Sequence, residues 1–239
     1  ISSCLIKGNF EVEDFTDMRQ AEIVVYNLAT DELVGIRPSR TYKFLIITTP
    51  VGHYYSEPVN VKIEKSYTRA ASGGVGRAKA AGNYAASMYP ALQAQKEGYH
   101  QLVWTDAAEH KYIEESGTMN IVFQIGDKLI TPDENHDTIL RGITKRSVFE
   151  IAKKWGIEVE ERMITVAEII EAAKNGSLKD AFGAGTAATI APIAMIGYED
   201  EKFMLPPVEE RLLSNKIKKY LGDLKTGRIA DEFGWNLLV

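Results

Sequence analysis

The sequence has 239 residues, of which 45% are hydrophobic, and it carries a formal net charge of −5. A chain of this length can build one large domain with a substantial core, and its mild acidity argues against a nucleic-acid-binding surface. The one cysteine, Cys4, excludes an intrachain disulfide and a thiolate zinc site. We find no apolar run long enough to span a membrane and no signal-peptide pattern, so we expect a cytoplasmic protein.

Two strand-like segments stand out in the first fifty residues. Ile23–Tyr26 is a short apolar run, and Arg40–Thr49 is rich in β-branched and apolar residues and is followed by Pro50. The second segment is typical of a buried strand that is closed by a turn. Further on, Val59–Lys65 alternates apolar with polar residues, which predicts a strand with one buried face and one wet face.

The region from Ser66 to Tyr84 is rich in glycine, alanine and serine and holds a single lysine, Lys79. Small residues leave the amine uncrowded and let the backbone approach a flat ligand closely. A lysine in such a place can lose its proton through desolvation and react covalently with a carbonyl group. On local composition alone a solvated surface charge is the commoner outcome, so Lys79 gains weight only from the segments that accompany it.

The rest of the chain mixes helices and strands without strict alternation, which favours an α+β fold. In chain order the predicted elements are a helix over Tyr84–Glu97, a strand over His100–Asp106, two strands within Asn120–Thr131 joined at Gly126 and Asp127, a helix over Gly142–Trp155, a strand over Ile157–Ile164, a helix that follows a capping box of Thr165 and Glu168 and ends at Gly176, a small apolar segment over Ala181–Ile196, and a last helix opened by Pro206 and Pro207.

Two of these helices have predicted buried faces. The helix over 84–97 contains Pro90, which predicts a kink or a restart, and Gly98 is expected to end it. Its buried face is predicted to consist of Tyr84, Met88, Ala91, Leu92 and Gln95. The helix over 142–155 is predicted to end at Gly156 and to bury Val148, Ile151, Ala152 and Trp155.

Three further segments have features of a ligand site. Tyr112–Asn120 places Glu114 and Glu115 before a small-residue turn, so one carboxylate can face a cleft, although a solvated acid pair is more frequent. Leu140–Thr144 sets a glycine and a threonine at the start of a helix, where the backbone amides suit a phosphate or a simple N-cap. Gly183–Ala188 is a glycine-rich turn that suits an anion or is a tight structural turn.

Together with Lys79, these segments require a ligand with a phosphate, an amine-reactive group and a basic ring nitrogen, and pyridoxal 5′-phosphate has all three. The stretches RAASGGVGRAKAAGNYAAS, WTDAAEHKYIEESGTMN, ILRGITKRSV and AFGAGTAATIAP and the tail GRIADEFGWNLLV resemble the branched-chain amino-acid aminotransferases, which are fold-type IV PLP enzymes. The resemblance runs from about Ala29 to Val239. It implies a large cofactor-binding domain over 66–239, an interdomain connection with a first strand over 51–65, and part of a small N-terminal α/β domain over 1–50.

The resemblance also implies the roles of single residues. Lys79 is the catalytic lysine that binds the cofactor, and Glu115 rather than Glu114 is the partner of the ring nitrogen. The other implied cofactor contacts are Tyr84 at the ring oxygen, Leu140 on the ring, and Ile143, Thr144, Gly185 and Thr186 at the phosphate. Backbone groups of Thr186, Ala187 and Ala188 are expected to meet the substrate carboxylate. The four histidines share no metal-ligand spacing, so we expect no metal site.

The reaction implied by the resemblance exchanges amino groups between Leu, Ile or Val and 2-oxoglutarate in a homodimer. Lys79 is expected to move a proton to and from the substrate Cα. Three alternatives remain from the sequence: a lyase relative such as an aminodeoxychorismate lyase, a D-amino-acid aminotransferase, and a non-catalytic remnant of the scaffold.

The sequence departs from the family pattern in three places. Arg141 stands where a proline is expected before the Gly-Ile-Thr turn. Ala188 and Ala191 stand where mammalian members have a Cys-x-x-Cys pair, so no thiol redox switch is expected. The phosphate-binding arginine and the pocket aromatics that the family's small domain supplies are not found in 1–18.

Overall fold

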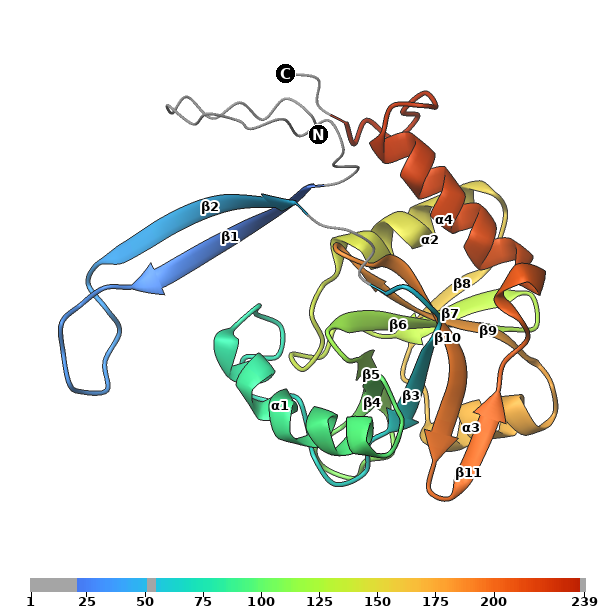
Figure 1. Cartoon of the computed structure of the whole chain (residues 1–239), viewed down its shortest axis with the longest axis horizontal. Helices are drawn as coiled ribbons and strands as arrows, with labels where there is room; N and C mark the ends of the chain where they lie inside the picture. The colour runs from blue at the N-terminus through green and yellow to red at the C-terminus, as the bar shows by residue number, and fades with distance from the viewer. Residues whose placement is uncertain (1–20, 51–54, 237–239) are drawn as a thin grey trace. The chain divides into compact units, whose positions relative to one another are not determined.

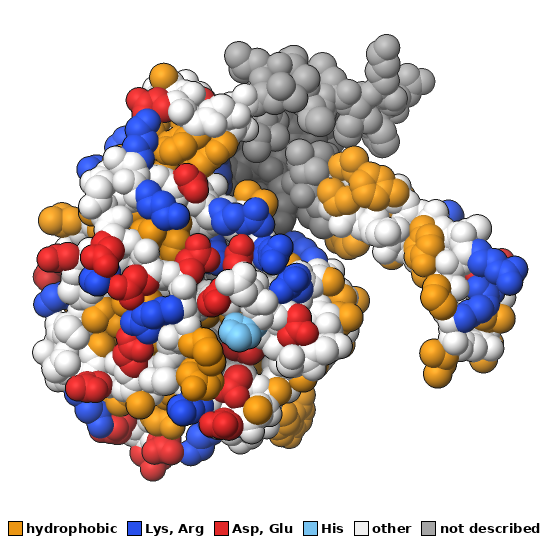
Figure 2. Space-filling view, turned by 180° about the vertical axis from the view of Figure 1, so that it is seen from behind, with side chains coloured by type: hydrophobic (Ala, Val, Ile, Leu, Met, Phe, Trp, Pro, Cys, Tyr) orange, Lys and Arg blue, Asp and Glu red, His pale blue; other side chains and the backbone are white. Residues whose placement is uncertain are grey.

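The computed structural model describes residues 21–50 and 55–236, and these belong to two compact units (Figure 1). The smaller unit holds the first range and the larger unit holds the second. Among the described residues no helix has the length and apolar character needed to cross a membrane. Figure 2 shows positive and negative side chains interspersed over one face of the larger unit, as expected from the mixed charges of the sequence.

The smaller unit contains a two-stranded antiparallel sheet of β1 (Ala21–Ala29) and β2 (Tyr42–Pro50). The two predicted strands are thus confirmed. The prediction that 40–49 is buried is wrong for the residues whose exposure is described, since Phe44 is 66% and Ile46 is 58% exposed. Apolar strand residues become buried only when a second layer covers them, and a single two-stranded ladder within 21–50 supplies none.

The larger unit is built on a sheet whose pairing closes on itself. Its strands are β3 (Val59–Ile63), β4 (Gln101–Thr105), β5 (Ile113–Ser116), β6 (Met119–Ile125), β7 (Lys128–Pro132), β8 (Val159–Arg162), β9 (Leu178–Gly185), β10 (Thr189–Tyr198) and β11 (Glu201–Met204). Because β9 pairs with both β6 and β10, strands β10, β3, β4, β5, β6 and β9 form a closed ring. Strands β7 and β8 extend the sheet from β6, and β11 extends it from β10 (Figure 1).

Both faces of the central strands are buried. On β6, Phe123 packs into the cluster that includes helix α3 (Val166–Lys174), whereas its neighbour Val122 packs into the cluster of α2 (Ile143–Lys154) and α4 (Leu212–Lys225). On β9, Ala181 and Phe182 divide between the same two clusters. Successive strand residues point to opposite faces, so a strand with helices on both sides reads as continuously apolar. The short 3₁₀ helix η1 (Val208–Glu210) precedes α4.

The ends of α2 and α3 follow the predicted stop and start signals, whereas Pro206 and Pro207 precede η1 and the last helix, α4, begins only at Leu212. Thr165 Oγ1 accepts a hydrogen bond from the Glu168 backbone N–H at 3.1 Å, which confirms the capping box at the start of α3. Gly156 and Gly176 both have φ of +76°, the left-handed conformation in which glycine replaces a helical residue without strain. The predicted buried face of the 142–155 helix is also confirmed, with Trp155 half-buried.

Helix α1 (Ala81–Lys96) differs from its prediction in two respects. It runs without interruption through Pro90, and its buried residues are Asn83, Pro90 and Ala94, whereas Met88 is 70% exposed. The helix approaches the sheet with its small residues, and Ala94 belongs to a cluster with Tyr99, Leu102, Trp104 and Met195. The apolar periodicity was misleading because the large side chains of α1 lie on the side away from this cluster.

Candidate active site

A buried acid fixes the start of the loop that carries Lys79. Glu64, at the end of β3, is only 8% exposed, and its Oε1 accepts hydrogen bonds from three successive backbone N–H groups. The donors are Lys65 at 2.9 Å, Ser66 at 2.7 Å and Tyr67 at 3.1 Å. A carboxylate that satisfies three amides holds the chain in one direction as it leaves the sheet. Nothing in the sequence pattern pointed to Glu64.

Arg69 connects that loop to the acid predicted for the cofactor ring. Its Nη2 donates to the carbonyl oxygen of Gly76 at 3.1 Å and to that of Thr138. Its Nε lies 3.0 Å from Glu115 Oε2 in an ion pair between side chains that are 9% and 4% exposed. Burial strengthens such a pair because little water screens it. Arg69 was not among the predicted site residues, although it opens the same motif that holds Lys79.

The second oxygen of Glu115 is held by the segment before α2. The backbone N–H of Leu140 donates to Glu115 Oε1 at 2.6 Å, and Asn120 Nδ2 lies 3.4 Å from the same oxygen. Asn120 also donates to the Leu140 carbonyl at 2.8 Å. Burial raises the pKa of Glu115 to about 7, although the Arg69 charge and the Leu140 N–H act in the opposite direction. The structure therefore holds both oxygens of this acid in place and brings its pKa near neutral pH.

Glu114 has a different environment from its neighbour, because adjacent side chains of a strand point to opposite faces. It lines a cavity of about 410 Å³ together with residues such as Asp137 and Thr138. Burial raises its pKa, opposed by Thr138 and by the Arg69 charge. The two acids are thus both buried, and the expectation of a solvated pair is not met.

The first backbone N–H groups of α2 have no side-chain cap among the described residues and can bind a ligand. The N-cap of α2 is Gly142. A Cβ at Gly142 would lie 1.7 Å from Asn120 Oδ1, so only glycine fits beside that amide. Thr144 is 9% exposed and Ile143 is 68% exposed. Unpaired first-turn amides and the helix dipole favour an anion at this point. Arg141, which replaces the expected proline, is exposed and leaves this turn in place.

The predicted glycine-rich turn over 183–188 is partly strand, because Gly183 and Gly185 belong to β9 and only 186–188 form the turn. This turn lies two strands from Glu115. Glu115 pairs with Asn120, and Asn120 pairs with Ala184, so about 10 Å of sheet separate the backbones of the acid and β9. Gly183 and Gly185 pack on the Met119 side chain, and added Cβ atoms would lie 2.6 and 3.0 Å from it. These glycines allow the sheet to close tightly under the turn.

The same turn ends in a strained residue. Thr189 has φ of +57°, which is unusual for a β-branched residue and is typical of ligand-binding turns. Lys225 of α4 donates from Nζ to Thr189 Oγ1 at 3.1 Å, and burial lowers the pKa of Lys225. Helix α4 therefore contacts the turn that the sequence assigns to phosphate and substrate. Of the predicted contacts on this turn, Thr186 is exposed, and Ala187 and Ala188 are half-buried.

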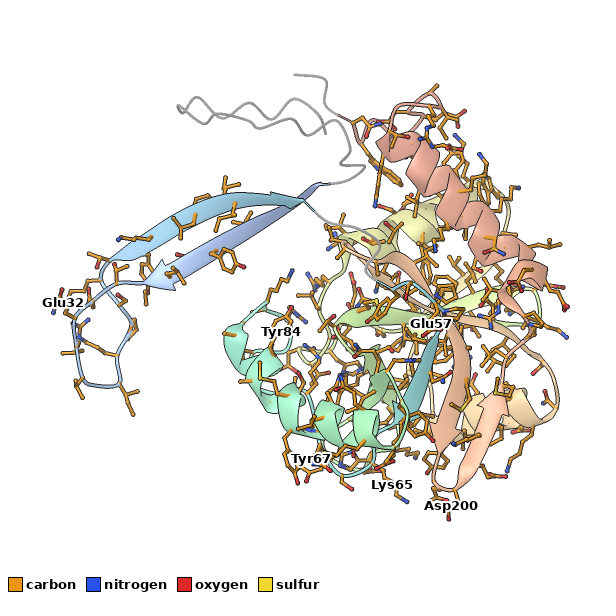
Figure 3. All side chains as sticks on the ribbon, in the orientation of Figure 1. Glu32, Glu57, Lys65, Tyr67, Tyr84 and Asp200 are labelled. Atoms are coloured by element: carbon orange, nitrogen blue, oxygen red, sulfur yellow. The ribbon has the colours of Figure 1, made fainter. Side chains whose placement is uncertain are left out.

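Lys79 is exposed, and its amine has no hydrogen bond or ion pair with the residues of 21–50 and 55–236. Its loop is ordered by Asn83, which is 6% exposed and donates from Nδ2 to the carbonyls of Val75 at 2.9 Å and Ala78 at 3.0 Å. Tyr84 is half-buried at the first turn of α1 (Figure 3). The catalytic role of Lys79 and the ring contact of Tyr84 stay predictions.

The structure thus brings together a subset of the predicted residues. Glu115, Leu140 and the turn over 142–144 form one cluster, and strand pairing places the turn after β9 beside it. Arg69 links this cluster to the loop of Lys79. Asn120 and Arg69 were missed because a polar residue in an apolar strand and an arginine in a glycine-rich loop have no distinctive local pattern.

The chain is similar to several known proteins. The family model of class IV amino-transferases matches residues 11–196. Branched-chain-amino-acid aminotransferase 2 of Bacillus subtilis (strain 168) is 44% identical over 87% of this chain and 58% of its own length. Branched-chain-amino-acid transaminase 1 of the same organism is 38% identical over 89% of this chain and 60% of its own length.

A crystal structure of the Escherichia coli branched-chain amino acid aminotransferase has a TM-score of 0.71 and 26% identity, covering 87% of this chain and 67% of that one. This similarity confirms the predicted α+β, fold-type IV architecture. The chain spans about 60% of the length of the two curated relatives. The match to the family model covers more than half of the sequence, and the chain therefore belongs to the class IV amino-transferase family.

Proposed function

We propose that this chain binds pyridoxal 5′-phosphate and transfers amino groups between branched-chain L-amino acids and 2-oxoglutarate. The observation that carries the proposal is the buried Glu115, held by Arg69 and Leu140 beside the uncapped start of α2. The acid would meet the ring nitrogen of the cofactor, and the free amides at the start of α2 would meet its phosphate. Family membership and the four sequence motifs support the same ligand.

The residues present fit that cofactor. Glu115 is buried, and burial raises its pKa by disfavouring its negative charge. A ring N–H that donates a hydrogen bond to Glu115 would stabilise that charge. The amides of Ile143 and Thr144 at the N-terminus of α2, with the turn over Gly185 and Thr186, are suited to the phosphate. Leu140 would pack on the ring and Tyr84 would reach its oxygen.

When bound, the cofactor supplies an electron-accepting ring and an aldehyde that reacts with amines. Lys79 would hold it covalently and then carry a proton to and from the substrate Cα. Glu115 would hold the proton of the ring nitrogen in place. Backbone groups of Thr186, Ala187 and Ala188 would orient the substrate carboxylate so that its Cα–H faces the lysine.

The substrate class follows from the resemblance and from the names of the curated relatives. An apolar pocket separates Leu, Ile and Val by only about 1–3 kcal/mol per methylene, so we expect all three to react. Assembly as a homodimer and a cytoplasmic location belong to the same proposal.

An amino-transfer assay tests the proposal. The purified chain is incubated with the cofactor, L-leucine and 2-oxoglutarate, and glutamate and the 2-oxo acid of leucine are measured together. We expect equal amounts of both products, with D-leucine inert. Pyruvate released from aminodeoxychorismate without glutamate would assign a lyase, and turnover of D-leucine would assign a D-amino-acid aminotransferase. A chain that stays colourless with the cofactor would be a non-catalytic scaffold.

A further inference from the structure

A fully buried lysine lies at the start of α2. Lys145 is 0% exposed, and its Nζ donates a hydrogen bond to Glu161 Oε2 at 3.0 Å and lies 2.8 Å from Glu134 Oε2. An ammonium group is removed from water at a large cost unless carboxylates compensate it. Here the two acids come from different elements, Glu134 from the segment between β7 and α2 and Glu161 from β8. Lys145 therefore joins three parts of the chain.

One of those parts, residues 133–140, is here named the bridging loop. Three of its groups hold the loop of Lys79: Asn135 O accepts from Arg77 Nη2 at 2.9 Å, Asp137 Oδ2 accepts from Gly73 N at 2.6 Å, and Thr138 O accepts from Arg69 Nη2. The two loops are in backbone contact, since a Cβ on Gly76 would lie 2.6 Å from Thr138 Cα.

The bridging loop also reaches the acid and the anion site. Its last residue, Leu140, donates from its backbone N–H to Glu115 at 2.6 Å, and two residues later Gly142 begins the uncapped turn of α2. The pairing of Lys145 with Glu134 fastens the first turn of α2 to this loop. A single buried charge thus fixes the position of the α2 amides relative to Glu115 and the Lys79 loop.

We propose that Lys145 is a positioning residue for phosphate binding, acting through the bridging loop rather than by contact with the cofactor. The proposal rests on the proposed function, because the phosphate is that of the cofactor. A direct role as phosphate ligand is disfavoured by the structure, since the amine of Lys145 is buried and faces two carboxylates.

Comparison of two ligands separates positioning from general stability. The cofactor-free chain is titrated with pyridoxal 5′-phosphate and with pyridoxal, which lacks the phosphate, for wild type, Lys145→Met and Lys145→Arg. We expect Lys145→Met to weaken binding of the phosphorylated ligand about tenfold or more, as loss of an outer-shell partner does at metal sites, and that of pyridoxal less than about twofold. Lys145→Arg keeps the positive charge, so we expect its affinity for pyridoxal 5′-phosphate to be close to that of wild type.

The chain offers a matched control in a second buried ion pair. Arg211 Nη1 lies 3.0 Å from Asp180 Oδ1, with side chains 1% and 2% exposed, on η1–α4 and β9. Asp180→Asn breaks this pair and is expected to lower stability while leaving the ratio of the two affinities unchanged. An equal loss for both ligands in Lys145→Met, or an equally changed ratio in Asp180→Asn, would overturn the proposal.

Amide hydrogen exchange of the cofactor-free chain keeps this inference separate from the proposed function. In Lys145→Met we expect faster exchange confined to 133–146 and 70–79, with Glu134→Gln giving a smaller change of the same pattern in case the first variant folds poorly. If wild type binds neither ligand, both the proposed function and the role in phosphate binding are wrong, and this pattern shows only that Lys145 holds the bridging loop to α2. Unchanged exchange in both variants would overturn the positioning role.

Discussion

The surroundings of Glu115 shift its pKa in opposite directions. Removal from water raises its pKa to about 7, while Arg69 at 3.0 Å and the Leu140 N–H at 2.6 Å favour the charged form. A protonated ring nitrogen would add a second positive partner and tip the balance toward the carboxylate. In the free protein, by contrast, the acid binds a proton near neutral pH.

This balance predicts a pH-dependent stability in the cofactor-free chain. An acid whose pKa rises on folding, here from 4.5 to about 7, binds a proton in the folded state where the unfolded state has lost it. Its contribution is present below pH 4.5 and is lost as the pH rises to 7, by about 3 kcal/mol in all. The free energy of unfolding of wild type should therefore fall relative to that of Glu115→Gln over this window, as measured by urea denaturation.

The comparison with Glu115→Gln cancels the other titrating groups, because both proteins share them. With the cofactor bound, the difference between the two proteins should no longer change in this way, since the acid is then ionised throughout. A difference that stays constant from pH 4.5 to 7 in the cofactor-free chain would show that Glu115 does not carry the raised pKa.

At the residue scale the motifs singled out Glu115 but not the side chains that hold it. Glu115 was selected over Glu114 by resemblance, and the structure supplies a physical distinction in the contacts of Arg69 and Leu140. Arg69 was not predicted because its partner Glu115 lies 46 residues further along the chain. Lys145 was not predicted because its two partners come from different elements, one of them 16 residues away. Charged side chains on loops and helices are usually solvated, so local pattern gives no signal for these two.

Among the elements, α2 and α3 begin in opposite ways. Helix α3 has the side-chain cap of Thr165, whereas α2 begins at Gly142 without one. A cap adds stability to a helix, so its absence at α2 leaves amides that a ligand can use. The two helices thus provide a test and a control within one fold.

Gly142→Ala should weaken cofactor binding selectively. The new Cβ would overlap Asn120 Oδ1, which must move and release the Leu140 carbonyl that its amide holds. We expect affinity for pyridoxal 5′-phosphate to fall at least about tenfold, the loss that corresponds to 1.4 kcal/mol, in a fluorescence titration. Normal affinity in this variant would mean that the phosphate binds elsewhere.

Thr165→Ala is the matching change at the capped helix. Loss of the hydrogen bond from the Glu168 N–H should lower the free energy of unfolding by about 1 kcal/mol, measured by urea denaturation, with cofactor affinity unchanged. A variant as stable as wild type would indicate that the cap contributes nothing to this fold.

Element identities were predictable where local chemistry decides them. Glycine stops, the capping box and the alternation of Val59, Val61 and Ile63 all produced the elements they indicate. The buried face of α1 was not predictable in this way, because what it packs against is decided by tertiary contact. Small residues of α1 meet the sheet, while Met88 and Leu92 point away.

On the scale of the whole chain, the two units differ in how their strands are covered. The central strands of the larger unit, such as β6 and β9, are buried on both faces, whereas the β1–β2 ladder exposes residues such as Phe44 and Ile46. The closed ring depends on β6 pairing with β9, more than 50 residues further along the chain. No local pattern encodes that pairing, and only the resemblance to a known family indicated the architecture.

This contrast predicts unequal protection from hydrogen exchange. An isolated two-stranded ladder is marginally stable in water, so the amides of β1 and β2 should exchange at least about a hundredfold faster than those of β6 and β9. Mass spectrometry of peptic fragments measures both regions in one sample. Equal protection would mean that the exposed apolar residues of β1–β2 are covered in solution.

Three lysines of the larger unit could form the covalent bond to the cofactor. Lys79 is exposed on its loop, and Lys145 is buried between two acids. Lys225 is exposed beside the turn after β9, and desolvation lowers its pKa. The most direct measurement is borohydride reduction of the chain incubated with pyridoxal 5′-phosphate, followed by digestion and mass spectrometry of the labelled peptide. We expect the cofactor on the peptide that contains Lys79 and no labelled peptide in Lys79→Ala. A label on Lys145 or Lys225, or undiminished labelling of Lys79→Ala, would contradict the proposed role of Lys79.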